Sequence, residues 1–190
     1  IKGFFNGLAE SVGSEYNFEL IVVSPYPLLK EDEHLFEYEN FKFIKDLGSP
    51  SRCLMVGSLL SNSKYFSWNS DDAQLLPDGL NKCIKIMDER DNEKDIMAIR
   101  YYEGPNFSGS ELPLDWYRAR FHADQRVLGV KNDWYLAPVA MFHTAWFKKI
   151  GGIKCSYEHA NLNNHIACYK TQFLGGTMLF SPTPIMSCDQ

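Results

Sequence analysis

The sequence predicts an α/β fold built as a largely parallel sheet flanked by helices. Its 190 residues, 45% of them hydrophobic, are enough for one globular domain with a substantial core. Segments with helical spacing alternate with strand-like apolar runs through the first half of the chain, and this alternation is typical of parallel α/β sheets. The first expected element is a helix, whereas doubly wound domains open with a strand, so we expect a further strand upstream of Ile1.

The first half supplies the clearest elements. Apolar spacing predicts an amphipathic helix over residues 1–12. The β-branched run Glu19–Val23 is typical of a strand buried on both faces, and Ser24-Pro25 ends it. Glu31–Glu39 is acidic and is expected to be a solvated segment. The other elements expected here are a strand at Phe41–Ile44, a helix at Cys53–Leu60, a strand at Tyr65–Trp68 and a helix at Gly79–Met87.

The second half is less regular. Pro138 places the strand expected at Trp134–Met141 at a sheet edge or a bend. Gly151-Gly152 ends the helix expected at Thr144–Ile150. The remaining expectations are a strand at Asp95–Tyr102, a loop at Glu103–Asp115, an ambiguous segment at Phe121–Leu128, a polar stretch at Tyr157–Asn164, a helix at Ile166–Phe173 and a strand at Thr177–Phe180.

Charge and cysteine content exclude several classes of protein. A net charge of -5 and a pI near 5.5 argue against a general surface for nucleic acid or anionic membranes. The 5 cysteines are odd in number and form no CxxC pair, which favours free thiols and a cytoplasmic location over a disulfide framework or a zinc site. No apolar run has the length of a membrane span.

An acidic pair follows an apolar, aromatic strand in the first half. Tyr65–Trp68 leads into Asn69 and Ser70, and Asp71 and Asp72 follow. Adjacent carboxylates at the carboxyl end of a strand lie where open α/β sheets bind ligands, and a divalent metal carrying phosphates would neutralise them. The alternative interpretation is that these carboxylates cap the helix that follows.

Two further groups of residues suit binding or catalysis. Glu158, His159 and His165 follow the double glycine, and their types suit a general base and ligands for a metal or phosphate. The alternative is a polar surface loop. Ser49–Arg52 precedes a helix, so backbone donors and the Arg52 side chain form a candidate anion site, with an ordinary helix cap as the alternative.

Aromatic residues make up 14% of the chain. Trp116 and Tyr117 follow the Gly- and Pro-rich loop, where a flat ring could stack on a sugar, whereas Trp134 and Trp146 are expected in the core. The sequence contains no glycine-rich phosphate loop of the two common kinds and no GxSxG elbow.

These motifs occur in the order found in family 2-like glycosyltransferases, and the chain resembles that family over most of its length. Glu19–Ser24 is similar to the family's second strand, and residues 66–80 resemble its strand, DXD-type motif and helix start. Ala145–Gly152 looks like the helix and double glycine before the acceptor side, and Glu158–Gly175 resembles the segment after them.

The resemblance implies a GT-A fold with a mostly parallel, mixed sheet, as a single domain over residues 1–190. Residues 1–90 would form the nucleotide-sugar-binding half and residues 91–190 the acceptor side. The implied activity is the metal-dependent transfer of a sugar from a nucleotide-diphosphate donor to a hydroxyl of a saccharide or glycan, usually with inversion.

The resemblance also implies roles for individual residues. Mn²⁺ or Mg²⁺ would be bound at Asp71 and Asp72, because Asn69 replaces the first Asp of the DXD motif. The candidate metal ligands His159 and His165 would assist. Ser24 and Arg52 would line the nucleotide side, with Asn69 near the donor.

The chain departs from the family where an acidic residue and an arginine are expected, because Ile166 and Lys170 occupy those positions. The resemblance therefore moves the catalytic base to Glu158. The same departure motivates an alternative, a non-catalytic module of this fold that binds sugar nucleotides or carbohydrate. A nucleotidyltransferase is a third possibility, since it uses a similar sheet and acidic site.

Overall fold

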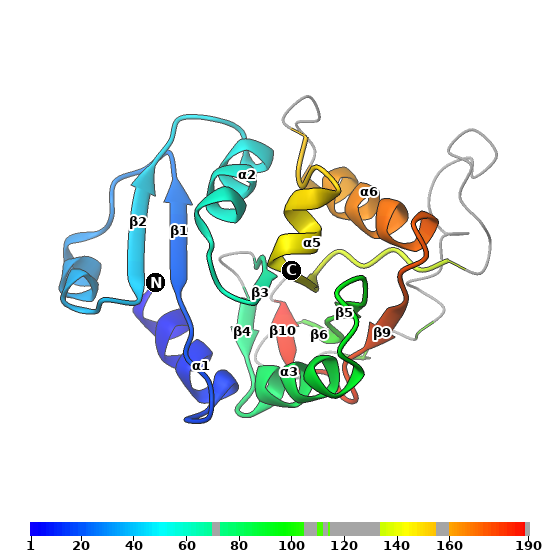
Figure 1. The fold of residues 1–190 in the computed structure, drawn as a ribbon. Coiled ribbons are helices and arrows are strands. Elements are labelled where there is room, and N and C mark those ends of the chain that lie inside the picture. The colour runs from blue at the N-terminus through cyan, green and yellow to red at the C-terminus, as the bar shows by residue number, and fades with distance from the viewer. Residues whose placement is uncertain (70–72, 105–109, 112–113, 115–133, 155–159, 189–190) are drawn as a thin grey trace.

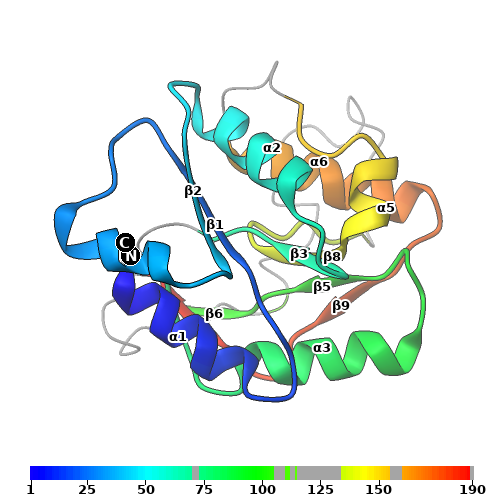
Figure 2. The same ribbon diagram turned by 60° about the vertical axis from the view of Figure 1, so that its left-hand side comes forward.

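The computed structural model describes residues 1–69, 73–104, 110–111, 114, 134–154 and 160–188. Helices cover both faces of the central strands (Figures 1 and 2). On one face lie α1 (Lys2–Val12) and α3 (Gly79–Arg90). On the other lie α2 (Pro50–Leu60), α5 (Thr144–Lys149) and α6 (Ala160–Phe173). The α/β class is confirmed.

The strands form three groups. A two-stranded parallel pair joins β1 (Leu20–Ser24) and β2 (Phe41–Lys45), with the 3₁₀ helix η1 (Lys30–Glu37) between them in the chain. One four-stranded sheet has the order β3 (Tyr65–Ser67), β8 (Ala140–His143), β5 (Ile96–Ala98) and β9 (Met178–Phe180). The other has the order β4 (Ala73–Leu75), β10 (Met186–Cys188), β6 (Tyr101–Glu103) and β7 (Ser110–Glu111).

Parallel and antiparallel pairs are mixed in the described strands. The pairs β1–β2, β5–β9 and β6–β10 are parallel, whereas β3–β8, β5–β8, β4–β10 and β6–β7 are antiparallel. Each four-stranded sheet contains strands from both halves of the sequence, so the two halves share their sheets.

The prediction of a single strand at Asp95–Tyr102 is wrong. The segment forms β5 and β6, which belong to different sheets. The residues between them bond elsewhere: the Ile99 amide donates to the Val139 carbonyl at 3.0 Å, and the Arg100 amide donates to Ser181 Oγ at 2.9 Å. Periodicity could not show this break, because apolar residues stand on both sides of it, at 96–99 and at 101–102.

Other boundaries also differ from the expectations. The strand expected at Trp134–Met141 begins only at Ala140, since Pro138 has no amide to donate to a ladder. The helix expected at Ile166–Phe173 begins at Ala160, inside the stretch expected to be only polar. The loop expected at Glu103–Asp115 contains β7 where it is described. The short strands β4 and β10 were not expected from the sequence.

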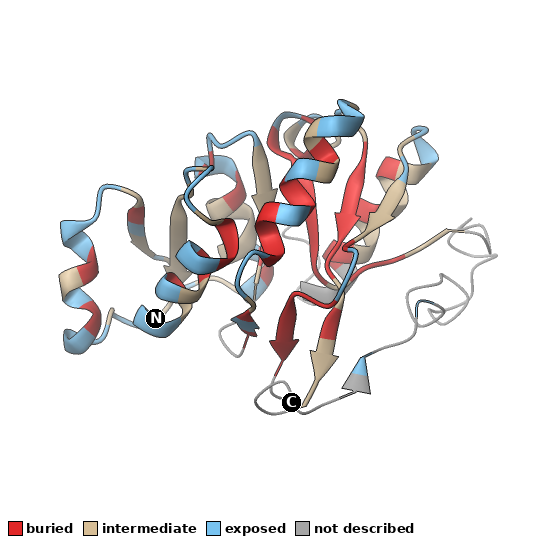
Figure 3. Ribbon diagram, turned by 90° about the horizontal axis from the view of Figure 1, so that it is seen from below, coloured by how far each residue is buried: buried red, intermediate tan, exposed pale blue. Residues whose placement is uncertain are grey.

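The strand expected to be buried on both faces is only half-buried. All residues of β1 have intermediate exposure, because among the described residues it pairs with β2 alone. Figure 3 shows this strand pair largely in tan, while buried residues gather in the four-stranded sheets and the helix faces against them. The acidic segment, which forms η1, is not wholly solvated, since Asp32 and Leu35 are buried.

The remaining helices and strands agree with the sequence to within a few residues. Helix α2 starts earlier than expected, because Ser49 caps it and Pro50 occupies its first turn. Trp146 is buried as expected, at 4% exposed, whereas Trp134 is only partly buried. The described cysteines Cys53, Cys83, Cys168 and Cys188 are free thiols. Among the described residues, no helix has the length and apolar character needed to cross a bilayer.

An aromatic cluster supports the end of β3. Phe142 is fully buried, and its ring centroid lies 5.5 Å from that of Trp68 and 5.1 Å from that of Phe147. Phe66 also packs on Trp68 and Phe147, with ring centroids 6.0 and 5.1 Å away. The cluster therefore fixes the backbone immediately before Asn69.

Replacing Phe142 with Ala is expected to lower the free energy of unfolding by about 3–5 kcal/mol, because a large side chain is removed from a fully packed position. Urea denaturation measures this loss. Leu47→Ala is the control, since Leu47 is 82% exposed and its loss should be within about 0.5 kcal/mol. A loss below about 1 kcal/mol for Phe142→Ala would show that the cluster does not anchor the sheet.

Candidate functional site

The carboxyl ends of β1 and β2 form one side of the candidate site. The strands are parallel and Ser24 is opposite Lys45, so both chains leave the sheet at the same edge. The Asp46 amide donates to the Ser24 carbonyl at 3.0 Å, which extends the pairing by one residue. Ser24 Oγ accepts from the Tyr26 amide at 3.1 Å. The predicted nucleotide-side residue Ser24 therefore lies at the edge where such sheets bind ligands.

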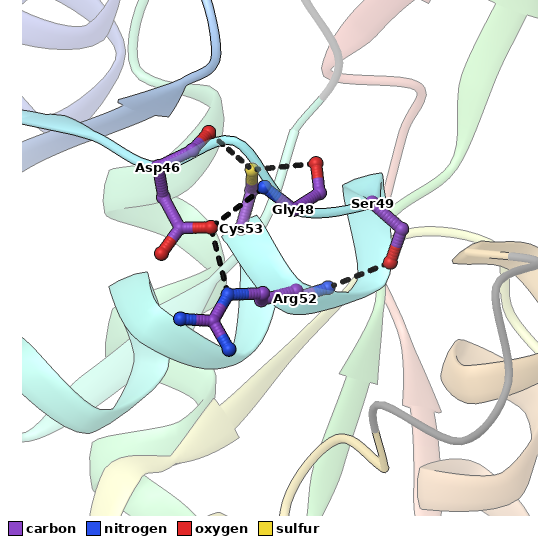
Figure 4. A network of polar contacts seen from close by, with 5 residues as sticks. All are labelled: Asp46, Gly48, Ser49, Arg52 and Cys53. Atoms are coloured by element: carbon purple, nitrogen blue, oxygen red, sulfur yellow. Dashed lines mark hydrogen bonds and ion pairs between the residues drawn. The ribbon is translucent and has the colours of Figure 1, made fainter.

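Arg52 is held at this edge by a compact set of contacts (Figure 4). Its Nε donates to Asp46 Oδ1 at 2.8 Å, and the Gly48 amide donates to the same oxygen at 2.8 Å. The guanidinium, and then the Gly48 amide, lower the pKa of the Asp46 carboxyl. Ser49 Oγ accepts from the Arg52 amide at 3.4 Å, so Ser49 caps the helix as the alternative interpretation expected. The Arg52 side chain is nevertheless 53% exposed and carries its charge to the surface.

The carboxyl end of β3 forms a second side. Trp68 is buried, and its Nε1 donates to the Pro138 carbonyl at 2.8 Å. Asn69 follows directly and is half-buried. Asp71 and Asp72 lie outside the described residues. The next helix, α3, begins at Gly79 with Asp78 as its N-cap, and β4 lies before it.

The first turns of α2 and α6 are joined by a buried hydrogen bond. Asn163 Nδ2 donates to Ser51 Oγ at 2.8 Å, and both side chains are at most 1% exposed. Asn163 Oδ1 also accepts from the Lys154 amide at 3.2 Å. This contact brings the helix that carries Arg52 against the helix that carries the predicted ligand His165, which is half-buried. Glu158 and His159, before α6, lie outside the described residues.

Asn164 joins α6 to the end of β3. Its Nδ2 donates at 2.7 Å to the Pro138 carbonyl, the same oxygen that accepts from Trp68. Asn164 is only 4% exposed, and its Oδ1 has no hydrogen-bond partner. A buried acceptor without a donor costs about 1–3 kcal/mol, so such an atom suggests a group that is absent from the free protein.

Hydrogen bonds connect the three sides of the candidate site, which are the carboxyl ends of β1 and β2, the carboxyl end of β3 and the start of α6. The chain of bonds runs from the edge of β1 and β2 through α2 and Ser51 to Asn163, and from Asn164 through Pro138 to Trp68. Ser24, Arg52, Asn69 and His165 therefore belong to elements whose ends are joined. The sequence analysis did not assign a role to Asn163 and Asn164. The only signal was that these two adjacent residues belong to a polar stretch. Within the described ranges no cluster of three or more His, Cys, Asp or Glu could hold a metal, and Asp71, Asp72 and His159 lie outside them.

No protein-family model and no curated protein match the chain, but solved structures do. Residues 1–349 of S. aureus TarS in complex with UDP match with a TM-score of 0.71 and 15% identity, covering 100% of this chain and 56% of that one. GalNAc-T7 with UDP, GalNAc and Mn²⁺ matches with a TM-score of 0.62 and 13% identity, covering 90% and 38%. The chain has the GT-A fold.

TarS 1–349 has also been crystallised with UDP-GlcNAc, and that structure matches this GT-A chain with a TM-score of 0.66 and 13% identity. The chain spans between 34% and 56% of the length of the TarS chains that it matches. The GT-A fold expected from the sequence is thus confirmed, with the edge of β1, β2 and β3 as its candidate active site.

Proposed function

We propose that this chain is a glycosyltransferase domain that transfers a sugar from a nucleoside-diphosphate donor to an acceptor hydroxyl, with inversion. One observation supports this proposal most. In a GT-A fold, hydrogen bonds connect the helix that carries Arg52, the end of β3 and the start of α6. The structures of TarS with UDP and UDP-GlcNAc, and of GalNAc-T7 with UDP, support the nucleotide-sugar donor.

The chain's own residues suit the donor. The Arg52 guanidinium is exposed at the edge and can pair with a phosphate or with the nucleotide, since guanidinium is a strong partner for phosphate oxygens. Ser24 contributes a hydroxyl beside it. Asn69 lies at the end of β3, on the side where the sugar and diphosphate would bind. The donor would therefore span from β1 to β3.

A divalent cation fits the residues that follow β3. Two adjacent carboxylates, with imidazoles from His159 and His165, would form a donor set that suits Mn²⁺ or Mg²⁺. Asp71 and Asp72 would hold the ion, and the presence of Mn²⁺ in the similar GalNAc-T7 structure supports a divalent cation. Such an ion neutralises charge on a leaving diphosphate.

Glu158 is proposed as the catalytic base, because it precedes α6, whose first turn is bonded to α2. A carboxylate there would take the proton from the attacking acceptor hydroxyl, on the face of the sugar opposite the diphosphate. The aromatic residues Trp116 and Tyr117 remain predicted to contact the acceptor sugar.

Asn164 is proposed to accept a hydrogen bond from the bound donor through its unpartnered Oδ1. Replacing Asn164 with Leu is expected to lower donor turnover about tenfold while changing the free energy of unfolding little. The variant loses the bond to Pro138, but it no longer buries an unpartnered acceptor. Comparing kcat/KM with a urea melt separates the two effects. Unchanged turnover would show that Asn164 does not contact the donor.

The direct test of this function is release of nucleoside diphosphate from a panel of nucleotide sugars that includes UDP-GlcNAc and UDP-GalNAc. Reactions contain Mn²⁺ or EDTA, with and without saccharide acceptors. Metal-dependent release that increases with one acceptor supports the proposal. Absence of release from every donor, by protein that unfolds cooperatively, contradicts it.

One observation favours the second candidate, a binding module without catalysis. Lys170, at the position of the family's arginine, donates its Nζ to the Ile150 carbonyl at 2.9 Å and so supports the end of α5. Ile166, at the position of the acidic residue, has no proton-accepting group. Donor binding with neither hydrolysis nor transfer would identify such a module.

A further inference from the structure

A pocket lies at the amino end of β3, opposite to the end that leads to Asn69. Its volume is about 430 Å³, and it is lined by residues 61–64, by His143 and Thr144 where β8 meets α5, and by Lys148 and Glu93. Lys64, which lines the pocket, precedes Asn69 by five residues, and at about 3.3 Å per strand residue this corresponds to a separation on the order of 16 Å. The pocket is thus separate from the candidate donor site, and its size is in the range of small-ligand pockets.

Two buried polar atoms without a hydrogen-bond partner belong to residues that line this pocket. They are His143 Nε2 and Thr144 Oγ1, and their residues are 8% and 5% exposed. Both residues are held firmly: the Thr144 amide donates to the Lys64 carbonyl at 2.9 Å, and the His143 ring packs edge-on against Tyr65 at 4.8 Å between centroids. Since buried polar groups nearly always find partners, two neighbouring ones beside a cavity indicate a ligand.

The two lysines that line the pocket already form bonds within the protein. Lys64 Nζ lies 2.5 Å from Asp88 Oδ1. Lys148 Nζ donates to the Leu59 and Ser61 carbonyls at 3.1 and 2.6 Å. The carboxylate of Glu93, 3.8 Å from Lys149 Nζ, also lines the pocket and would repel an anion.

The groups left for a ligand are uncharged. Burial, and then the charge of Lys64, lower the pKa of His143, which keeps its imidazole neutral at pH 7. A neutral imidazole nitrogen and the Thr144 hydroxyl can each take part as donor or acceptor. Sugar hydroxyls have the same dual character and carry no charge, whereas phosphate is an anion that the Glu93 carboxylate would repel.

We propose that this pocket is a second site, which binds a saccharide unit through His143 Nε2 and Thr144 Oγ1. The site goes beyond the proposed transfer reaction and does not depend on it, because it lies at the other end of β3 and needs neither nucleotide nor metal. Residues Ser61, Asn62 and Ser63 provide additional hydroxyl and amide groups around the sugar.

The test is an NMR titration of the whole chain, labelled with ¹⁵N, with N-acetylglucosamine and glucose at millimolar concentrations and without nucleotide or metal. Saturable shifts of the Asn62, Lys64 and Thr144 amides are expected with at least one of these sugars. Thr144→Val should weaken this affinity about tenfold, because it removes one hydrogen bond. Its Tm should be equal or higher, since the hydroxyl has no partner in the free protein.

Thr177→Val is the matched control, because Thr177 is exposed and lies next to β9. His143→Gln is the second variant if Thr144→Val does not fold, and it should also weaken binding. Absence of saturable shifts with both sugars, or equal affinity in the wild type and the folded variant, would overturn the proposal. Shifts with inorganic phosphate but not with sugars would overturn it as well, since they would indicate an anion site.

Discussion

Replacing Asp72 with Asn is expected to lower donor turnover about 10³-fold while the protein stays folded. The substitution retains size and removes the negative charge that would hold a divalent cation on the donor diphosphate. Stabilisation of a developing charge by a metal is worth several kcal/mol, and each 1.36 kcal/mol corresponds to about tenfold in rate. Release of nucleoside diphosphate at saturating donor measures the loss, across a range of Mn²⁺ concentrations.

Asp91→Asn is the matched control for this experiment. Asp91 is exposed and follows α3 with a positive φ of 46°, a conformation that Asn adopts readily. The control variant should turn over donor as the wild type does, and both variants should keep the wild-type Tm. Wild-type turnover in folded Asp72→Asn protein would contradict the assignment of the metal to this pair.

Glu158→Gln is expected to lower sugar transfer by about 10²–10⁴-fold with little change in donor affinity. The amide keeps the shape of the side chain and cannot accept the acceptor's proton, so the chemical step should slow while binding remains. Transfer to a saccharide acceptor measures kcat, and titration with donor and Mn²⁺ measures affinity. The acidic limb of the wild-type pH–rate profile should be absent in the variant.

Glu89→Gln on the exposed side of α3 is the control for this second substitution. Loss of donor affinity together with transfer would give Glu158 a binding role. Undiminished transfer in Glu158→Gln would place the base elsewhere. His159, next to it in the sequence, would then be the first residue to test.

The local pattern of the sequence predicted most helices, because helical periodicity and capping are set by neighbouring residues. Ser49 and Pro50 at the start of α2 are an example. Prediction from the local pattern failed where residues distant in the sequence determine the structure. The strand break at Ile99 and Arg100 depends on Val139 and Ser181, and β10 forms only between β4 and β6.

The candidate site shows the same division. Arg52 was proposed because a helix start suits anions, and Ser24 was implied by the family resemblance; the roles of both residues stay predictions. Asn163 and Asn164 could not be assigned, since their roles depend on Ser51 and Pro138, which are far away in the sequence. The pocket around His143 was missed for the same reason: its walls come from separate segments.

The proposed function depends most on a nucleotide-sugar site at the carboxyl ends of β1, β2 and β3. Isothermal titration of the folded chain with a panel of nucleotide sugars, in Mn²⁺ and in EDTA, tests it most directly. We expect one donor to bind in Mn²⁺ and to lose most of its affinity in EDTA. A cooperatively folded chain that binds none of the donors under either condition would contradict the account.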